Sequence, residues 1–498
     1  MKRVLFFTVV LCLLTAGLFA SGSSASTASS ANEVTLTMIN RVNTDVIIEN
    51  NAMLRYIREK YGFNIQLEAP PINNYNERIQ IIMASADLPD IVYLWGLDQN
   101  YIQWAEQGLF NAVDNLVTSY PNIMHNVTPD YFDVGRVPSD GKVYTVPRPS
   151  AVGYWGYECN VAWLKKLGIS APTTLDEYYE FGKLVRDNDP DGNGQADTYL
   201  LSPDGTVGGS SYYAFITEAF MPQTGAPDFD GVYKVRERLS GYLPYLDYMR
   251  KLYTEGIMDP EYVVNKTYGG HEKMLANRVA TNGSHLSHIH EYEFENSNGA
   301  FDWIDVFPNL KNTDGIARNY VAPPTWGGFC LPASSNKTRD ALRFLDWGNS
   351  LEGFEILWCG VPGLTYNSYD FATRSLDQTP EQKSLWTSVT ASYMTIASAY
   401  DGVVAYISSN PVTVAHFNQS LANYHNVVTT VNIKPVSNPD MNRFNSDNPD
   451  LVTRRDELEN LYVTGLATRA ELENFINSQW LPRIATAEAT YVKMMTQR

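Results

Sequence analysis

The stretch Gly141 to Leu164 reads GKVYTVPRPSAVGYWGYECNVAWL, and we expect the rest of the chain to be organised around it. Residues 143–146 alternate between apolar and polar or amphipathic side chains, which predicts a half-buried strand. Pro147 and Pro149 follow, and because proline cannot donate to a sheet ladder they bar a central position in a sheet. We expect the chain to leave one lobe here, to enter a second, and to line the cleft between them.

Three aromatic residues of this stretch have two alternative roles. Tyr154, Trp155 and Tyr157 carry flat, amphipathic rings that suit a binding surface. Buried aromatic rings also pack in ordinary cores. The sequence leaves both roles open for each ring.

The patterns before this stretch predict an alternation of strands and helices. In chain order we expect a strand at 34–39, a helical face at 53–61 ended by Gly62, a strand at 64–68, a helical face at 79–86 and a strand at 87–95. This order is typical of an α/β fold with a parallel sheet covered by helices. Such sheets bind ligands outside the carboxyl ends of their strands, and Trp95 falls at such an end.

Later segments are mainly helical. Thr174 with Glu177, and Thr468 with Glu471, form capping boxes that predict two helix starts. We expect further helices at about 243–255 and 337–347.

The first 25 residues have the pattern of a signal peptide. Lys2 and Arg3 precede an apolar run from residue 4 to 20 and a tract of small residues, with cleavage expected after Ala25 or Ala20. The run is slightly short for a membrane span, so we expect a soluble mature protein. Cys12 follows Leu11, where a lipoprotein signal requires a small residue. We therefore expect a secreted, periplasmic protein without a lipid anchor.

Composition and charge limit the class of protein. The 498 residues are 44% hydrophobic and 18% charged, which is typical of a folded chain with two or more domains. The net charge is -18, and it becomes -20 once Lys2 and Arg3 are removed. Such a surface repels phosphate backbones and anionic lipid, which argues against nucleic-acid and membrane-surface binding. The remaining Cys159, Cys330 and Cys359 match neither a disulfide scaffold nor a zinc site, although one disulfide is compatible with them.

Residues 187–198, DNDPDGNGQADT, predict a calcium loop. Oxygen donors recur at alternate positions, as a hard cation requires. A register that begins at Asp187 ends at Thr198, where a bidentate Glu is needed. The preferred register uses Asp189, Asp191, Asn193, the Gln195 carbonyl and Asp197. The alternative is a solvated acidic turn, although close carboxylates without a cation would repel one another.

Other motifs give weaker indications of chemistry. The run 284–295 contains His285, His288, His290, Glu291 and Glu293, but it lacks the HExxH pattern of a zinc site, so an exposed strand is favoured over a metal. The sequence has no GxSxG motif, Walker loop or dinucleotide fingerprint. A glycosidase carboxylate pair is not singled out by local spacing.

Taken in order, several segments resemble one family. They are NNYNERIQIIMASADLPDIVY (73–93), GKVYTVP (141–147), DPDGNGQADTYLLS (189–202), YMRKLYTEGIMDPE (248–261) and ALRFLDWGNSLEGFEILWCGVPGLTY (341–366), followed by a helical C-terminus. The chain resembles an extracellular solute-binding protein of a carbohydrate-type ABC transporter, in particular the larger members related to the LipO and alginate-oligosaccharide-binding proteins.

The resemblance implies a two-lobe periplasmic-binding-protein fold of type II, with hinge strands joining the lobes and the ligand cleft between them. Lobe 1 would comprise residues 32–147 and about 323–385, and lobe 2 residues 148–322 and about 386–498. Relatives hold structural calcium in the loop that matches 189–197. Many carry an acidic residue where this chain has Thr198, which leaves that one ligand unsettled. The missing lipid-attachment motif favours a periplasm.

The expected function is non-catalytic capture of a carbohydrate, in particular an oligosaccharide, and its delivery to the permease subunits of an ABC importer by a monomeric protein. Sugar rings stack on aromatic side chains, and their hydroxyls need polar partners. The ligand-binding candidates are Trp95, Arg148, Tyr154, Trp155, Tyr157, Tyr213, Trp326 and Trp358. Alternatives are a secreted, calcium-stabilised carbohydrate-active enzyme, or the same fold serving a peptide or a sensory partner.

Overall fold

A computed structural model gives the structure of the chain. It describes residues 33–41, 47–70, 74–85, 87–150, 155–207, 213–266, 269–285, 304–321, 325–390, 396–401, 403–404, 410–411, 414–415, 417–418, 421–422, 428–433 and 438–496. The proposed signal segment, Tyr154 and residues 288–293 of the histidine run lie outside the described residues. Within the described ranges, each helix is either too short or too polar to be a membrane span.

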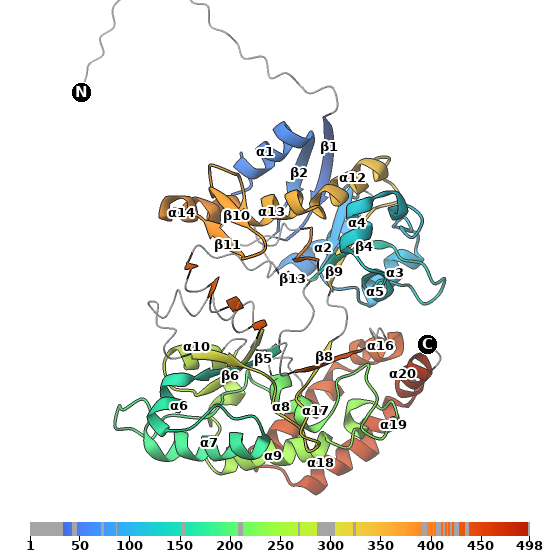
Figure 1. Cartoon of the computed structure of the whole chain (residues 1–498). Helices are drawn as coiled ribbons and strands as arrows, with labels where there is room; N and C mark the ends of the chain where they lie inside the picture. The colour runs from blue at the N-terminus through green and yellow to red at the C-terminus, as the bar shows by residue number, and fades with distance from the viewer. Residues whose placement is uncertain are drawn as a thin grey trace, which may run out of the picture.

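The first lobe is built on a five-stranded sheet with the order β2-β1-β3-β9-β4 (Figure 1). Its strands are β1 (Val34–Ile39), β2 (Phe63–Glu68), β3 (Ile91–Leu94), β4 (Thr145–Pro149) and β9 (Thr325–Cys330). β1 is parallel to both β2 and β3, whereas β9 is antiparallel to its neighbours β3 and β4. The expected parallel strand–helix alternation is confirmed.

Helices surround this sheet. The main ones are α1 (Ala52–Tyr61), α2 (Tyr75–Met83), α3 (Gln99–Glu106), α4 (Pro121–Asn126), α5 (Pro129–Val134), α12 (Thr338–Gly348), α13 (Leu351–Cys359) and α14 (Pro380–Val389). Gly62 ends α1 in the left-handed conformation, as expected. Small two-stranded sheets, β10 (Ser368–Asp370) with β11 (Ser375–Asp377) and β12 (Ala399–Tyr400) with β13 (Val403–Val404), complete the lobe.

Strand β4 lies at the edge of the sheet, as its prolines require. Its pairing with β9 is irregular between Pro147 and Pro149. Proline removes a ladder donor, and an edge strand tolerates that loss on its free side. The prediction that this segment cannot be central is therefore confirmed.

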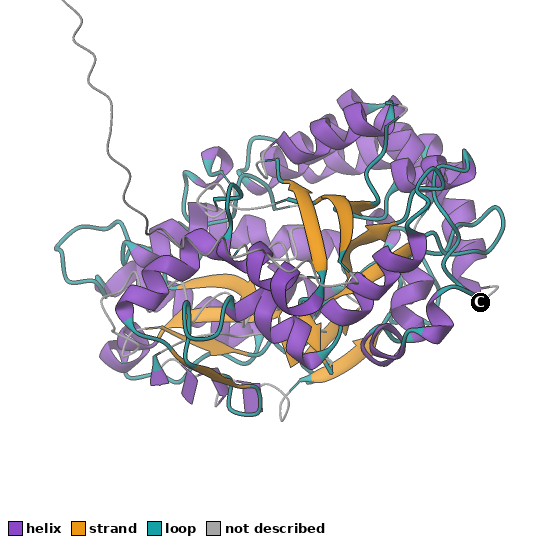
Figure 2. Ribbon diagram, turned by 90° about the horizontal axis from the view of Figure 1, so that it is seen from above, coloured by secondary structure: helices purple, strands orange, loops and turns teal. Residues whose placement is uncertain are grey.

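The second lobe contains a three-stranded antiparallel sheet with the order β6-β5-β7, and a parallel pair of β8 with β14. The strands are β5 (Trp155–Asn160), β6 (Thr281–His285), β7 (Ile304–Phe307), β8 (Arg318–Val321) and β14 (Thr429–Asn432). The helices include α6 (Val161–Leu167), α7 (Leu175–Asn188), α8 (Ala214–Phe220), α9 (Tyr242–Thr254), α10 (Gly269–Leu275), α16 (Pro439–Asp447), α17 (Pro449–Val463), α18 (Arg469–Phe475) and α20 (Ala485–Thr496). Both predicted capping boxes are present, at α7 and α18. Helices surround much of the strand layer, although some strands reach the surface (Figure 2).

Each lobe has its own large hydrophobic core. One core joins β1–β4 and β9 to their helices, and the other joins β5 to α7–α9 and the C-terminal helices. The described residues change lobe between 150 and 155, between 321 and 325, and between Asn418, which hydrogen-bonds to Thr373 and Arg374, and residue 428. Cys159, Cys330 and Cys359 are buried and form no disulfide within the described residues.

The second segment of lobe 1 extends beyond the expected boundary near residue 385. Asn51 donates to the Val389 carbonyl at 3.0 Å, and Asn126 donates to the Ala399 carbonyl at 3.1 Å. Ile396 packs in the first core. Residues 386–390, 396–401 and 403–404 therefore belong to lobe 1, because their buried polar and apolar partners and the β12–β13 pairing are there.

Candidate functional site

The candidate site is the end of the five-stranded sheet that faces the second lobe. Because β3 and β4 both run antiparallel to β9, their carboxyl ends meet the amino end of β9 at one edge. β4 ends at Pro149 and β9 begins at Thr325, so both strands meet the second-lobe side of the sheet at this same end. Trp95 follows β3, Arg148 is in β4 and Trp326 is in β9. The fold thus brings three of the predicted residues to the same end of the sheet.

Trp95 presents an exposed aromatic surface at this edge. Its side chain is 43% exposed, although it follows the fully buried strand β3. The guanidinium carbon of Arg41 lies 3.3 Å from the centre of the Trp95 ring, and Arg41 is only 2% exposed. A cation over an aromatic face is attracted by the ring quadrupole. Arg41 was not among the predicted residues. It lies two residues after β1, which ends on the same side of the sheet as β3, and that position was the only sequence feature that pointed to it.

The backbone beneath Trp95 is tightly seated. Gly327 has φ +115°, and a Cβ atom there would lie 1.8 Å from the Leu94 carbonyl oxygen. Only glycine fits this approach of β9 to β3. The Tyr75 hydroxyl also donates to the Tyr93 carbonyl at 2.7 Å. The end of β3 is therefore held from both sides.

Arg148 lines the same edge but is 1% exposed. Its guanidinium carbon lies 5.9 Å from the centre of the Tyr93 ring. The next residue, Pro149, accepts a hydrogen bond from Ser398 at 2.7 Å. Arg148 therefore belongs to the wall of the site rather than to its open surface.

Two of the predicted aromatic residues are core residues instead. Tyr157 is fully buried, donates to the Pro172 carbonyl at 2.5 Å and stacks on Phe215. Tyr213 is also buried, and its hydroxyl donates to the Ser202 carbonyl at 3.2 Å. Tyr157 and Cys159 share a face of β5 and both pack in the core of the second lobe, so the core role left open by the sequence is the one observed.

The remaining candidates are placed less fully. Trp358 is half-buried on α13, and its indole nitrogen donates to the Ala397 carbonyl at 3.0 Å. Trp155 and Trp326 are placed by their strands alone: Trp155 pairs with His285 at one end of β5, and Trp326 lies next to Gly327. Tyr154 lies outside the described residues.

The second lobe contributes a buried pair that the sequence reasoning missed. Glu158 is fully buried on β5, and Nδ1 of His271 on α10 lies 3.6 Å from its carboxylate. Burial lowers the pKa of His271, but the hydrogen bond and the charge of Glu158 outweigh it and raise that pKa above its ordinary value. Asn282, also buried, lies opposite Glu158 in the pairing of β5 with β6. Helix α10 is on the side of this lobe that faces the first (Figure 1).

The acidic loop after α7 is curled by its own hydrogen bonds. Asp189 has a left-handed backbone, and its carboxylate accepts from the backbone nitrogens of Gly192 at 3.1 Å and Gly194 at 2.9 Å. The Asn193 amide nitrogen donates to Asp191 at 2.7 Å and to Asp197 at 3.0 Å. The atoms that this loop could offer to a metal ion are all oxygens, which suits a hard cation.

The pKa values in this loop separate because two carboxyls share a hydrogen bond. Burial and the contact with Asp189 raise the pKa of Asp191, whereas the contact with Asp191 and the glycine nitrogens lowers that of Asp189. Among the described residues no three His, Cys, Asp or Glu side chains converge as a metal centre. Thr198 is buried and donates to the Val185 carbonyl at 3.1 Å, so its hydroxyl points into the fold rather than into the loop.

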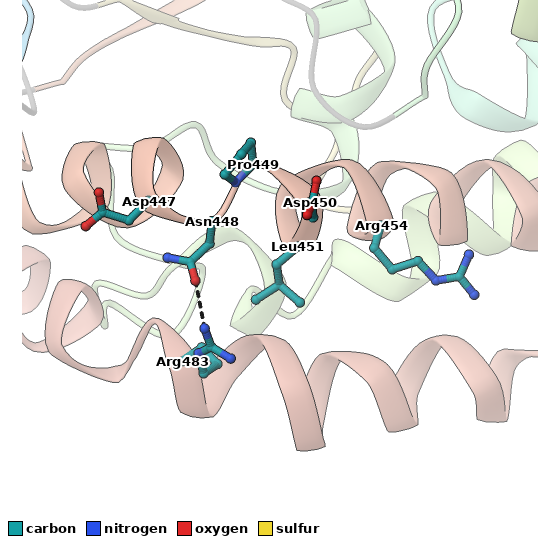
Figure 3. A pocket seen from close by; sticks show the side chains of 7 residues that line it. All are labelled: Asp447, Asn448, Pro449, Asp450, Leu451, Arg454 and Arg483. Carbon is teal, nitrogen blue, oxygen red and sulfur yellow. Dashed lines mark hydrogen bonds between the residues drawn. The ribbon is translucent and has the colours of Figure 1, made fainter.

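A separate pocket lies between α16, α17 and the C-terminal helices (Figure 3). It is lined by Asp447, Asn448, Pro449, Asp450, Leu451, Arg454 and Arg483. Arg483 donates to the Asn448 side chain at 2.7 Å. None of these lining residues is aromatic, so the pocket offers no ring on which a sugar could stack.

The protein has two lobes, each with its own hydrophobic core, and the chain passes between them more than once. The end of the first sheet that carries Trp95 faces the second lobe. This arrangement is that of two-lobed extracytoplasmic binding proteins. The family model for bacterial extracellular solute-binding proteins matches residues 48–353, and the chain belongs to this family. Its members are secreted or periplasmic.

Individual relatives agree with this assignment. The chain is 27% identical over 339 residues to lipoprotein LipO of Bacillus subtilis; the match covers 64% of this chain and 65% of LipO. An extracellular solute-binding protein from Bifidobacterium longum subsp. infantis has a similar structure, with a TM-score of 0.72, 14% identity and coverage of 93% of this chain and 98% of that one. FusA of Streptococcus pneumoniae, an ABC-transporter substrate-binding protein solved with kestose, gives a TM-score of 0.68, 18% identity and coverage of 93% and 99%. A FusA EF-hand mutant has also been solved. The structural likenesses establish the type II two-lobe fold.

Proposed function

We propose that this protein captures a carbohydrate, in particular an oligosaccharide, outside the cytoplasm and delivers it without catalysis to the permease subunits of an ABC importer. The observation that carries the proposal is Trp95, an exposed indole at the sheet end that faces the second lobe. A sugar ring buries its C–H face well on such an indole. The complex of the similar FusA with kestose supports the ligand class.

Capture would take place by closure of the two lobes. The ligand would stack on Trp95 from lobe 1 and meet polar groups of lobe 2 near α10, where His271 lies beside Glu158. A ligand favours the closed form only by the difference in its affinity for the two forms.

Isothermal titration against a panel of kestose, raffinose, maltotriose and trigalacturonate tests the ligand class. We expect one member to bind, and Trp95→Ala to weaken that binding at least ten-fold, which corresponds to about 1.4 kcal/mol. Chromatography of the titrated sugar should show no products, which separates capture from hydrolysis. A protein that binds peptides tightly and none of these sugars would refute the proposal.

We also propose that the mature protein begins after the signal segment, carries no lipid anchor and is monomeric. The residue before Cys12, Leu11, is the support for the missing anchor. Intact-mass measurement of protein from its host would detect an added lipid, and light scattering would give the oligomeric state.

We propose that the loop Asp189–Asp197 binds a structural calcium ion. Its oxygen donors, the crowding of Asp189 with Asp191, and the EF-hand of the similar FusA support this. Binding would require Asp189, Asp191 and Asp197 to converge and the Asn193 amide to turn its oxygen inward. Asp187 already pairs with Arg186 at 2.6 Å, which favours the register that begins at Asp189.

Calcium titration of the melting temperature tests this site. A hundred-fold excess of calcium over its dissociation constant stabilises the folded state by about 2.7 kcal/mol. We expect calcium to raise the melting temperature of the wild type and of Asp187→Asn, and to leave that of Asp191→Asn unchanged. Equal melting curves of the wild type in calcium and in EDTA would count against the proposal.

A further inference from the structure

We propose that Arg41 is a positioning residue, which holds the indole of Trp95 by one face so that the opposite face alone receives the sugar. This inference rests on the proposed carbohydrate function, and it names a residue that acts on the ligand through Trp95 rather than by touching it.

The contact is close and one-sided. At 3.3 Å from the ring centre, the Arg41 guanidinium is in van der Waals contact with the indole face. Arg41 is 2% exposed whereas Trp95 is 43% exposed, so the pair has a buried member and a surface member. The exposed area of Trp95 is therefore on the side away from Arg41.

The position of Arg41 is itself constrained. Its backbone nitrogen donates to the side-chain oxygen of Asn40 at 2.8 Å, and Asn40 is fully buried at the end of β1. β1 pairs with β3 through Ile39 and Val92, and continuing that register places Arg41 opposite Leu94, next to Trp95. Arg41 thus reaches Trp95 from the neighbouring strand without a flexible loop between them.

The backbone of Trp95 has little freedom of its own. The Leu94 carbonyl is pressed against Gly327, and Gly96 follows with φ +99°. The side-chain torsions are then the main remaining freedom of Trp95, and the Arg41 stack restricts them. Fixing a ring before the ligand arrives reduces the ordering cost of binding, which is the benefit expected of preorganisation.

The first test needs no ligand. Subtracting the emission of Trp95→Phe from that of the wild type isolates the fluorescence of Trp95, and acrylamide quenching then measures its accessibility. Arg41→Met should raise the quenching constant of Trp95 about two-fold, because the second face opens. The matched control is Arg343→Met. It removes an arginine of the same lobe that lies 5.8 Å from the centre of the Phe63 ring, and it should leave the quenching constant of Trp95 unchanged. An unchanged constant in Arg41→Met overturns the proposal.

The second test uses the panel sugar that the wild type binds. Arg41→Met should weaken binding about ten-fold, Arg41→Lys should recover part of the loss because it keeps the charge without the flat stack, and Arg343→Met should bind normally. Circular dichroism checks the fold of each variant. If Arg41→Met is unfolded, Arg41→Gln takes its place. Normal affinity in a folded Arg41→Met refutes the positioning role. If the wild type binds no sugar, the proposed function fails, while the quenching result still decides whether Arg41 orders the ring.

Discussion

Replacing Arg236 should destabilise the second lobe strongly. Glu459, on α17, is fully buried and receives a hydrogen bond from Arg236 at 2.9 Å and another from the Tyr242 hydroxyl at 2.8 Å. The Arg236 side chain is itself only 20% exposed. Removing one partner of a buried ion pair costs about 3–5 kcal/mol, because the other charge stays buried. Since Arg236 retains some exposure, we expect Arg236→Met to cost about 3 kcal/mol.

The assay is urea unfolding followed by far-ultraviolet circular dichroism. Arg454→Met is the control. Arg454 pairs with Glu457 on the exposed side of α17, the helix that carries Glu459, and exposed pairs contribute less than about 1 kcal/mol. The double variant Arg236→Met/Glu459→Leu should recover most of the loss, since it leaves no buried charge unpaired. A loss below about 1 kcal/mol in Arg236→Met, or a double variant as unstable as the single one, would refute this reasoning.

Three further substitutions test other parts of the structure. Glu218 is buried, and burial raises its pKa well above the usual value. Its contribution to stability is therefore full below the ordinary glutamate pKa and is lost as the pH rises through the raised pKa. Glu218→Gln should flatten the fall of the melting temperature with rising pH, and an unchanged slope would contradict this. Gly327→Ala should cost more than about 3 kcal/mol, because its Cβ would meet the Leu94 carbonyl oxygen, whereas Gly141→Ala, with φ +71° and open space around it, should cost about 1 kcal/mol by the same urea assay; similar losses would refute the close approach. Thr174→Ala should cost about 1 kcal/mol of unfolding free energy through loss of the α7 cap, and a neutral variant would show that the capping box adds nothing.

Local patterns predicted the framework of lobe 1 well. The alternation at 34–39 and 64–68, the helical spacing between them and the glycine after the first helix all describe contacts within a few residues. The prolines of β4 also reported their edge position, because the missing donor is a property of the residue itself. The two capping boxes were equally readable, since each is completed within one turn of helix.

The candidate site was predicted only in part. Trp95 could be placed at the carboxyl end of a strand, where ligands bind in parallel sheets. Tyr157 could not be assigned, because a strand shows which residues share a face but not which face the core covers. Its burial against Phe215 depends on α8, which is distant in sequence.

By itself, the sequence determined the α/β class, the order of strands and helices and the stretch at which the chain leaves its first lobe, because these follow from spacing, caps and prolines along the chain. Only the tertiary structure decided that Arg41 lies under Trp95, that Glu158 lies beside His271, and that the segment around Ala399 returns to the first lobe. Each of these is a contact between segments that no local pattern connects. Their energies come from burial and charge, and each contact exists only once the lobe that contains it has folded.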